Sequence, residues 1–544
     1  MVQRRRKFWG WGWEEEGLDP AEQQRLAALL AARFQLADLR PSPPPRVEEI
    51  PLRAPRVHVP TRLASFCTTD AHERLGHSYG KSFRDLVRAW RRQYDNPVDF
   101  VAYPENEDQL EAILAWCTDQ RVAAIPYGGG SSVVGGVEPP RESHCRGAVS
   151  IDLSRLDRVL EVDRESRAAR IQAGVYGPSL EEQLRPYQLT LRHFPQSFEF
   201  STLGGWIATR SGGHYATLYT HIDEFVESLR VLTPSGWVET RRLPGSGAGP
   251  SPDRLFIGSE GTLGIITAAW MRLQDRPRYR ATASVRFADF LAGAKAVRAI
   301  AQAGLYPSNL RLLDPTEALT AGAGDESAAI LVLGFESADH PLDPWMQRAL
   351  ECCRDYGGSY DDTTWRTRED AEAARSGAAG AWRSAFLRGP YLRDTLVSLG
   401  MVSETFETAV TWDRFPELHA GVLATVQRAL NELCGGGQVS CRFTHVYPDG
   451  PAPYYTVIAP GRGGDLVALW DAIKAAASEA ILVHGGTITH HHAVGRDHRP
   501  WYDRERPELF ARALVAAKAA LDPAGILNPG VLIDAVTAQG KERA

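Results

Sequence analysis

The chain has 544 residues, a formal net charge of -6, 43% hydrophobic residues and 24% charged residues. Because single cores stop growing at about 250 to 300 residues, this length predicts two large domains with packed cores. The acidic balance argues against a nucleic-acid partner, and seven cysteines without a C-x-x-C pair argue against a disulfide framework or a structural zinc site, so we expect a cytoplasmic protein.

The first predicted region, residues 1–94, is helical and extended. A helix over residues 20–37 would present one broad apolar face made by Leu26, Leu29, Leu30, Phe34 and Leu36. The proline-rich stretch 41–60 cannot form the interior of a helix or a sheet, and it predicts an extended connector that runs over the surface.

Strand and helix patterns alternate in the second region, residues 95–276, which predicts an α+β domain. The expected strands lie at 100–103, 122–126, 148–153, 158–162, 168–173, 229–238 and 264–273, and the expected helices at 106–117 and after the capping pattern Ser179-x-x-Glu182. A third region, residues 277–500, opens with a strand and helix over 280–300 and contains a long helix at 466–482. In the last region, residues 501–544, a helix over 507–521 ends at Asp522-Pro523-Ala524-Gly525.

Three clusters of small residues in the second region could form an anion site. They are Pro126-Tyr127-Gly128-Gly129-Gly130-Ser131-Ser132, then Gln196-Ser197-Phe198-Glu199-Phe200-Ser201-Thr202 with Thr209-Arg210-Ser211-Gly212, and Gly258-Ser259-Glu260-Gly261-Thr262-Leu263-Gly264. Glycine amides can approach a pyrophosphate closely, and serine hydroxyls add donors. Each cluster alone is typical of a plain turn or hairpin. Three clusters in one domain favour a site that holds a phosphate-bearing cofactor.

Three consecutive histidines, His490-His491-His492, follow Gly485-Gly486. In an extended chain, His490 and His492 would point to one side and His491 to the other. Three interpretations remain open at this stage: metal binding, a solvated cluster, and a proton-handling or electrostatic role.

The glycine clusters resemble those of the FAD-binding domain of the vanillyl-alcohol oxidase and p-cresol methylhydroxylase superfamily. The resembling patterns are P-x-G-G-G-[ST]-S, S-x-E-F-S-T-x-G-G-W and G-S-E-G-T-L-G. The resemblance implies FAD, and an α+β fold in which a two-subdomain FAD-binding domain carries a cap domain with an antiparallel sheet and flanking helices. Because the first loop contains no histidine or cysteine, we expect noncovalent FAD.

More distant motifs narrow the resemblance to the alkyldihydroxyacetonephosphate synthases. They are K-F-W-G-W-G at 7–12, N-L-R-L-L-D at 309–314, Y-L-R-D at 391–394, W-D-R at 412–414 and T-x-x-Y through Tyr at 444–454, together with the histidine triplet. This family exchanges the acyl group of acyl-dihydroxyacetone phosphate for a fatty alcohol, without net redox change. The resemblance therefore implies lipid substrates, and with it we expect a homodimer whose membrane contact is peripheral at most.

The resemblance also implies residue roles. Tyr454 matches an acid/base tyrosine, Arg393 a substrate arginine, Arg311 an arginine beside flavin and substrate, and His490 to His492 a stretch needed for activity. A tyrosine has an ordinary pKa of about 10, so base catalysis near neutrality needs cationic neighbours, which the histidines and Arg311 could provide. Each of these residues also has an ordinary structural interpretation, as a core tyrosine or an ion-pair arginine.

The ending Asn528-Pro529-Gly530 supports an alternative. It is typical of flavin-linked 2-hydroxy acid dehydrogenases, so the alternative enzyme is an FAD-dependent D-lactate or glycolate dehydrogenase or oxidase. The alternative that is not an enzyme is a flavin-binding structural or sensory protein. Because the last residues are Glu542-Arg543-Ala544 rather than S-K-L, we expect no peroxisomal import, as in a bacterial homologue.

Overall fold

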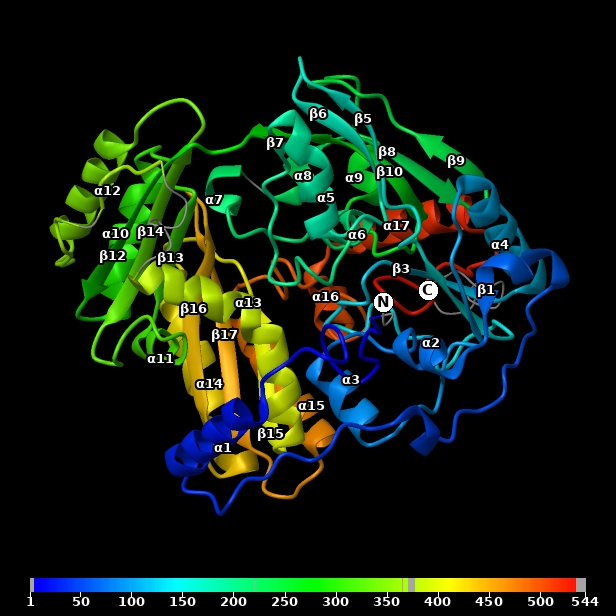
Figure 1. Cartoon of the computed structure of the whole chain (residues 1–544), viewed down its shortest axis with the longest axis horizontal. Helices are drawn as coiled ribbons and strands as arrows, with labels where there is room; N and C mark the ends of the chain where they lie inside the picture. The colour runs from blue at the N-terminus through cyan, green and yellow to red at the C-terminus, as the bar shows by residue number, and fades with distance from the viewer. Residues whose placement is uncertain (1–3, 220, 364, 370–376, 535–544) are drawn as a thin grey trace.

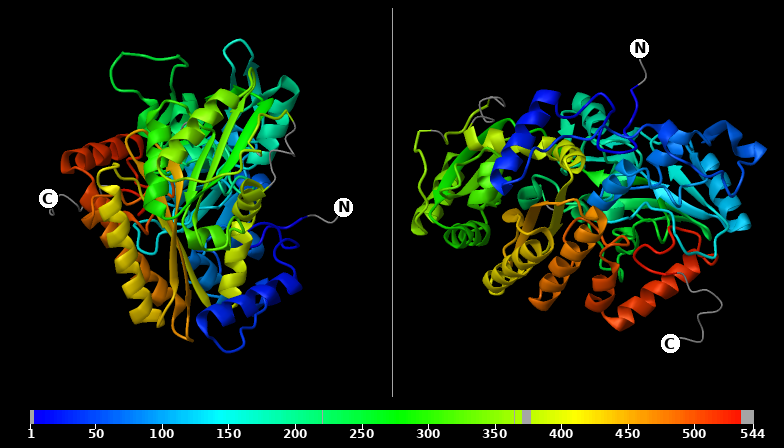
Figure 2. Two further views of the ribbon diagram at one scale, coloured as in Figure 1. Left: turned by 90° about the vertical axis from the view of Figure 1, so that its left-hand side faces the viewer. Right: turned by 90° about the horizontal axis from the view of Figure 1, so that it is seen from below.

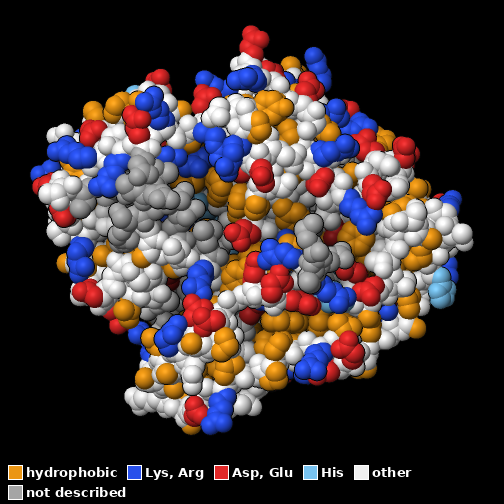
Figure 3. Space-filling view, in the orientation of Figure 1, with side chains coloured by type: hydrophobic (Ala, Val, Ile, Leu, Met, Phe, Trp, Pro, Cys, Tyr) orange, Lys and Arg blue, Asp and Glu red, His pale blue; other side chains and the backbone are white. Residues whose placement is uncertain are grey.

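The computed structural model describes residues 4–219, 221–363, 365–369 and 377–534. The chain forms two halves that lie side by side, one with a four-stranded sheet, a five-stranded sheet and the two-stranded pair of β7 (Leu189–Thr190) and β11 (Gln274–Asp275), and one with a single six-stranded sheet (Figure 1). On the face drawn in Figure 3, acidic and basic side chains are interspersed over both halves, and hydrophobic side chains gather in the middle of the face. No helix in the described ranges is long and apolar enough to cross a membrane.

The first sheet has the strand order β1-β2-β4-β3. Its strands are β1 Cys67–Thr68, β2 Phe100–Ala102, β4 Ala148–Asp152 and β3 Ala123–Tyr127. The last three run parallel and are buried almost throughout, as apolar strands covered on both faces should be. Helix α4 (Glu107–Gln120) is capped by Asn106, the first residue of the predicted helix, and runs three residues past the predicted end, to Gln120.

The second sheet is antiparallel, with the order β5-β6-β10-β8-β9. Its strands are β5 Val159–Asp163, β6 Ala168–Gln172, β10 Ile265–Arg272, β8 Val226–Thr233 and β9 Gly236–Glu239. The single strand predicted at 229–238 is wrong, because the chain reverses between β8 and β9 in a two-residue turn. The Ser179 capping pattern is also wrong: α5 (Gly177–Leu184) begins earlier, with Pro178 in its first turn and with Tyr176 as an N-cap whose side chain makes no capping hydrogen bond.

The six-stranded sheet is antiparallel, with the order β12-β14-β13-β16-β17-β15. Its strands are β12 Tyr279–Phe287, β14 Ala329–Ser337, β13 Asn309–Leu313, β16 Gln438–Val446, β17 Pro451–Pro460 and β15 Met401–Glu407. One face packs on helices α10 Phe290–Gln302, α12 Asp343–Asp355, α14 Phe415–Cys434 and α15 Leu466–Val483, and forms the largest core. The other face meets α11 Pro315–Thr320 and α13 Gly377–Ser398 (Figure 2, left). Because strand side chains alternate, residues of one parity enter the large core and those of the other parity lie on the face that α11 and α13 cover.

The two ends of the chain pack on different halves. Helix α1 (Pro20–Phe34) lies against Leu396, Met401 and Ile458 of the six-stranded half, using Ala27 and Leu30. Leu29 was predicted on the packed face, but its side chain is 61% exposed because it projects away from the sheet. At the other end, α17 (Glu508–Leu521) ends at Asp522, and residues 526–527 join the first sheet beside β3.

The remaining elements are short connectors. They are η1 Val47–Glu49, η2 Thr61–Phe66, α2 Ala71–Gly76, α3 Phe83–Trp90, η3 Arg185–Tyr187, β7 Leu189–Thr190, α6 Leu203–Thr209, α7 Ala216–Tyr219, α8 Ile222–Phe225, α9 Asp253–Phe256, β11 Gln274–Asp275 and α16 Arg499–Glu505. Apart from η1, residues 41–60 are extended, in agreement with the prediction from their prolines.

Candidate active site

The first glycine loop leaves β3 with its backbone donors free. Within the described part of the chain, none of the N–H groups of residues 128–132 donates a hydrogen bond to the protein. A Cβ at Gly129 would overlap the carbonyl oxygen of Phe200, and Gly130 has φ +65°, so both positions require glycine. Successive free amides form a cradle for an anion such as a pyrophosphate.

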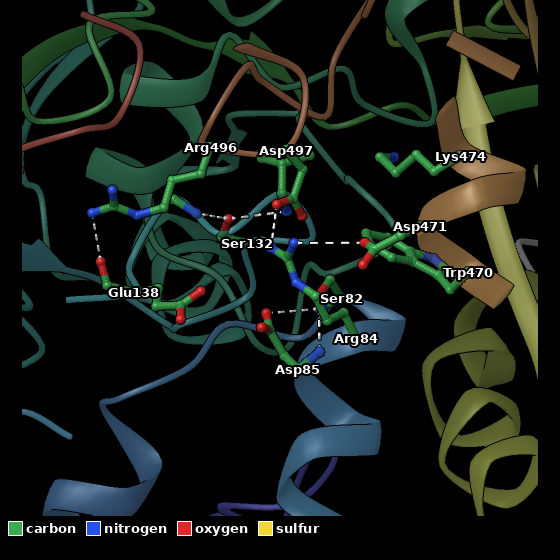
Figure 4. A network of polar contacts seen from close by, with 12 residues as sticks. Ser82, Arg84, Asp85, Ser132, Glu138, Trp470, Asp471, Lys474, Arg496 and Asp497 are labelled. Atoms are coloured by element: carbon green, nitrogen blue, oxygen red, sulfur yellow. Dashed lines mark hydrogen bonds and ion pairs between the residues drawn. The ribbon is translucent and has the colours of Figure 1, made fainter. Parts of the chain in front are cut away.

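A polar network holds this loop from behind (Figure 4). The carbonyl oxygen of Ser132 accepts the N–H of Lys81 at 2.6 Å, and its hydroxyl accepts the N–H of Gly136 at 2.9 Å. Arg84, on α3, lies between Asp497 and Asp471. The network therefore ties the loop to α3 and, through Asp497, to the segment that follows the histidine triplet.

In the second glycine loop, unlike the first, most backbone N–H groups donate hydrogen bonds to the protein. The N–H groups of Gly258 and Glu260 donate to α6, and those of Ser259 and Thr262 donate within the segment 256–262. The buried carboxylate of Glu260 accepts the N–H groups of Val494 and Gly495 at 2.9 and 2.8 Å. Burial raises the pKa of Glu260 to about 7 although both amides oppose the shift. This loop thus connects the glycine clusters to the histidine loop.

Both glycine loops open into one cavity of about 350 Å³. The predicted cofactor residues that line it are Pro126, Tyr127, Gly128, Gly129, Gly130, Ser131, Ser132, Gln196, Ser197, Ser201, Thr202, Thr209, Ser211, Gly212, Glu260, Gly261 and Gly264. Phe198, Glu199, Phe200, Arg210, Gly258, Ser259, Thr262 and Leu263 stand behind this lining. Arg210, for example, pairs with Asp223, and Phe198 stacks on Trp206.

The far wall of the cavity is the polar face of the six-stranded sheet. Glu407 of β15 is directly opposite Tyr454 of β17, which is directly opposite Arg442 of β16. Opposite residues of antiparallel strands project to the same face, so these three side chains form one row. Tyr454 and Arg442 line the cavity, and the Arg442 guanidinium lies 3.9 Å from the centre of the Tyr454 ring.

Two buried arginines bring positive charge to this wall. Arg311, on β13, donates one long bond to the carbonyl oxygen of His214, but its buried Nε and Nη1 have no partner among the described residues. Arg442 pairs with Glu317, while its Nε is likewise without a partner in the described part of the chain. Burial and the neighbouring Arg442 lower the pKa of Arg311 to about 9, so it stays charged at neutral pH. Unpaired buried donors of this kind are satisfied when an anionic ligand binds.

Arg393 also lines the cavity, from helix α13. Its Nη2 donates to Thr405 of β15 at 2.8 Å. The next residue, Asp394, accepts the N–H of Trp11 and pairs with buried Lys7 at 3.2 Å. The N-terminal segment 7–12 therefore fixes the part of α13 that carries Arg393, and Trp11 completes the cavity wall.

The histidine triplet is not an extended strand, so the predicted alternation is wrong. The backbone N–H groups of His490, His491 and His492 all donate to the buried carboxylate of Glu407, at 2.5, 3.1 and 2.9 Å. Wrapping around one carboxylate turns the three rings into a cluster whose neighbouring centroids are 5.2 and 4.8 Å apart. His491 and His492 line the cavity, whereas His490 lies behind them against Tyr447 and His445.

The cationic field comes from arginine rather than from histidine. Burial lowers the pKa of His491 to about 3, and the nearby His221, Arg442 and Arg311 add to this effect. Burial also lowers the pKa values of His490 and His492 well below the usual range. The rings are therefore neutral at pH 7, and a neutral imidazole can accept a hydrogen bond at one of its two nitrogens. His445, His490 and His491 are close enough to hold a metal ion. Hydrogen bonds already occupy both ring nitrogens of His445 and of His490, which weakens the metal interpretation.

Sequence reasoning assigned no site role to Arg442, His445 or Glu407. All three lie within or at the end of strands whose alternate residues are apolar. Polar residues between the apolar positions of a buried strand indicate a polar site on the other face of the sheet. Arg442 interrupts a buried strand two residues before Thr444, and both face the cavity. Glu407 ends β15 at the point where the histidine loop returns, a contact between residues far apart in the sequence.

Comparison with known proteins agrees with this geometry. Residues 98–241 match the family model of an FAD binding domain, and residues 276–532 match that of the FAD linked oxidases, C-terminal domain. FAD is thus the cofactor, and the free amides of the first loop fit its pyrophosphate. Over 477 residues, 85% of this chain and 78% of the relative, the sequence is 30% identical to alkyldihydroxyacetonephosphate synthase of Trypanosoma brucei brucei. The chain belongs to the alkyldihydroxyacetonephosphate synthase family.

Structure comparison places the fold in the same family. A solved alkyldihydroxyacetonephosphate synthase superposes with a TM-score of 0.78 at 26% identity, covering 96% of this chain and 98% of that one. A relative that represents the alternative, glycolate oxidase subunit GlcD of Bacillus subtilis, is 28% identical over 80% of this chain and 89% of its own length. The expected membership of the alkyldihydroxyacetonephosphate synthase family, and the α+β fold with an antiparallel cap sheet, are confirmed.

Proposed function

We propose that this protein exchanges the acyl group of acyl-dihydroxyacetone phosphate for a fatty alcohol, giving an ether lipid precursor without net redox change. The observation that carries the proposal is the row of Tyr454 and Arg442, with Arg311 beside it, on the wall of the cavity into which both glycine loops open. A doubly charged phosphate ester needs buried cationic donors, and this wall provides them.

Each group of residues would have a separate role in the reaction. The amides of residues 128–132 would hold the pyrophosphate of FAD, whose ring system, when bound, supplies activation of the dihydroxyacetone carbon. Arg311 and Arg442 would bind the substrate phosphate, and Arg393, with its planar fork, the carboxylate that departs. Tyr454 would move the proton beside the ketone, because its side chain projects into the cavity next to His491.

The apolar end of the cavity suits a hydrocarbon chain. Leu392 and Leu396 of α13 and Ile458 of β17 line it, and α1 packs against Leu396 and Ile458 from outside. Burying an acyl chain there would contribute about 0.8 kcal/mol for each CH₂ group. A 2-hydroxy acid such as lactate has no hydrocarbon chain to bury there, so this apolar end does not favour it as the substrate.

The Asn528-Pro529-Gly530 ending does not supply a substrate contact. The side-chain amide of Asn528 donates to the carbonyl oxygens of Gly136 and Glu260 at 2.9 and 2.8 Å, so it joins the two glycine loops. We propose that this ending serves the cofactor domain, which both enzyme classes share, and therefore does not distinguish their substrates.

Several finer features are part of the proposal. We propose noncovalent FAD, a homodimer, a cytoplasmic location with membrane contact that is peripheral at most, and the four regions 1–94, 95–276, 277–500 and 501–544. Release of all flavin into the supernatant after acid precipitation would support the noncovalent state, and a pellet that stays yellow would refute it.

The test of function is an assay of the purified holoenzyme with palmitoyl-dihydroxyacetone phosphate and hexadecanol. We expect the alkyl product and free palmitate, identified by mass. If no alkyl product forms and D-lactate or glycolate bleaches the flavin under anaerobic conditions, the protein is a 2-hydroxy acid dehydrogenase instead.

A further inference from the structure

The proposed exchange produces a proton inside the active-site cavity. An acyl ester and an alcohol become an ether and a carboxylic acid, and an acid with an ordinary pKa between about 4 and 5 leaves as its carboxylate at neutral pH. The hydroxyl proton of the alcohol is therefore left over in each turnover. This inference rests on the proposed function, because only that reaction releases the proton.

A chain of hydrogen bonds leads away from the cavity through the histidine loop. His491 lines the cavity, and its Nδ1 lies 3.0 Å from Nδ1 of His490. On the far side of the His490 ring, Nε2 lies 2.7 Å from the hydroxyl of Tyr447. Nε2 of His491 has no hydrogen-bond partner among the described residues, so it is available to a group in the cavity.

Tyr447 carries the chain to a second pocket. This pocket, of about 910 Å³, is lined by Tyr447 but by none of the three histidines. Exposed Asp449 and the carboxylate of Glu505 also line it, and both can pass protons to water. His490 and Tyr447 thus stand between the active-site cavity and a more open pocket.

The charges on the cavity side favour outward transfer. Arg311 and Arg442 stand on the cavity side of His491 and disfavour a proton bound there, whereas the second pocket is lined by two acidic and two basic side chains, Asp449, Glu505, Arg414 and Arg504. Burial, with Asp223 and Glu407 nearby, raises the pKa of Tyr447, so its hydroxyl keeps a proton to give as it receives another. Glu407 holds the loop in place through its three amide bonds.

We propose that His491, His490 and Tyr447 form a proton exit from the active site to the second pocket. A proton taken by Nε2 of His491 displaces the Nδ1 proton to His490, the Nε2 proton of His490 passes to the Tyr447 oxygen, and the Tyr447 hydroxyl proton passes to water. One proton enters and one leaves, and no electron moves. His490 and Tyr447 are relay residues that act through His491 and touch no substrate.

The variant that tests the exit is Tyr447→Phe, which removes one oxygen and keeps the ring. We expect kcat to fall roughly tenfold or more, while KM and the flavin content stay unchanged. The solvent deuterium isotope effect on kcat should increase. Added imidazole, which is small enough to enter the second pocket, should restore turnover. The matched control is Tyr455→Phe. That buried tyrosine also contacts a histidine, His419, but on the opposite face of the sheet, so its kcat and isotope effect should match those of the wild type.

A second measurement does not depend on turnover. In the holoenzyme labelled with ¹⁵N-histidine, Tyr447→Phe should shift the ring signals of His490, and Tyr455→Phe should leave them in place. Unchanged His490 signals, or an unchanged kcat in a wild type that makes the alkyl product, would overturn the exit. If the wild type makes no alkyl product while the His490 signals still respond, the proposed function fails and the hydrogen-bonded chain remains established.

Discussion

At the scale of single residues, the site is defined by groups that the protein leaves unsatisfied. Arg311 is almost fully buried, yet two of its nitrogens find no partner in the residues that the structure describes, and its neighbour is another cation. An isolated buried charge is costly, so the fold retains it only where a ligand compensates. The same residue therefore weakens the apo protein and strengthens binding of an anionic substrate.

Replacing Arg311 with methionine separates these two effects. We expect kcat/KM for acyl-dihydroxyacetone phosphate to fall at least about 30-fold, because a buried charge contact is worth about 2 kcal/mol or more. The melting temperature of the ligand-free protein should stay level or rise, since an unpaired buried charge is removed. Steady-state kinetics and calorimetry check both, and a destabilised variant with normal kcat/KM would assign Arg311 a purely structural role.

Tyr454→Phe tests the acid/base residue. The ring and its stacking against Arg442 remain, so flavin content and melting temperature should match those of the wild type. Loss of a positioned proton-transfer group should lower kcat by about 100-fold or more. Single-turnover measurement of palmitate release provides the check, and a normal rate would remove Tyr454 from the mechanism.

At the scale of elements, strand alternation organises the site. On β13, β16 and β17 the residues of one parity enter the large core, and those of the other parity face α13 and the cavity. Tyr455 and Tyr454 show this division directly: the first packs on His419, and the second faces the histidine loop. A one-residue shift in register would therefore exchange core and site.

The first glycine loop allows a similar test. In Gly129→Ala the added methyl group would overlap the Phe200 carbonyl oxygen, so the loop must move and its amides lose their common focus. We expect the purified variant to lack FAD, as measured by the 450 nm absorbance per protein. Gly245→Ala is the control, because nothing lies within 4 Å of a Cβ there, and it should bind FAD normally. Equal flavin content in both variants would contradict the cradle.

At the scale of the whole molecule, buried histidines make stability depend on pH. Burial lowers the pKa of His193 to about 3 and that of His419 to about 4, and it also lowers the values of His445, His490, His491, His492 and His498. Below a pH of about 6.5 the unfolded chain takes up protons at these residues that the folded chain refuses. Stability therefore falls as the pH drops from about 6.5 toward 4.

Buried carboxyl groups act in the opposite direction but are fewer. Burial raises the pKa values of Glu260 and Asp314 to about 7 and those of Asp394 and Asp497 to about 6, so their protonation favours the folded state as the pH falls. We expect a net decrease of the melting temperature between pH 7 and pH 5. His419→Gln should reduce this decrease, and an unaltered pH dependence in that variant would refute the assignment.

Much of the fold could be predicted because its signals are local. The helix after Asn106 has a cap and an apolar period, and the alternating strands of the first domain follow their hydrophobic pattern. Errors occurred where a turn is short or a cap is formed without a side chain, as at residues 234–235 and at Tyr176. The exposed Leu29 shows that a helix has more apolar residues than its neighbour covers.

The sequence by itself determined the family, the flavin and many of the residues that line the cavity, because glycine clusters and the motifs around Arg393 and Tyr454 are local patterns. Only the tertiary structure showed that Glu407 gathers the histidine loop, that Arg442 lies over Tyr454, and that Tyr447 links His490 to a second pocket. These contacts join strands and loops far apart in the chain. Their energies depend on burial and on neighbouring charge, and neither can be read from the order of the residues.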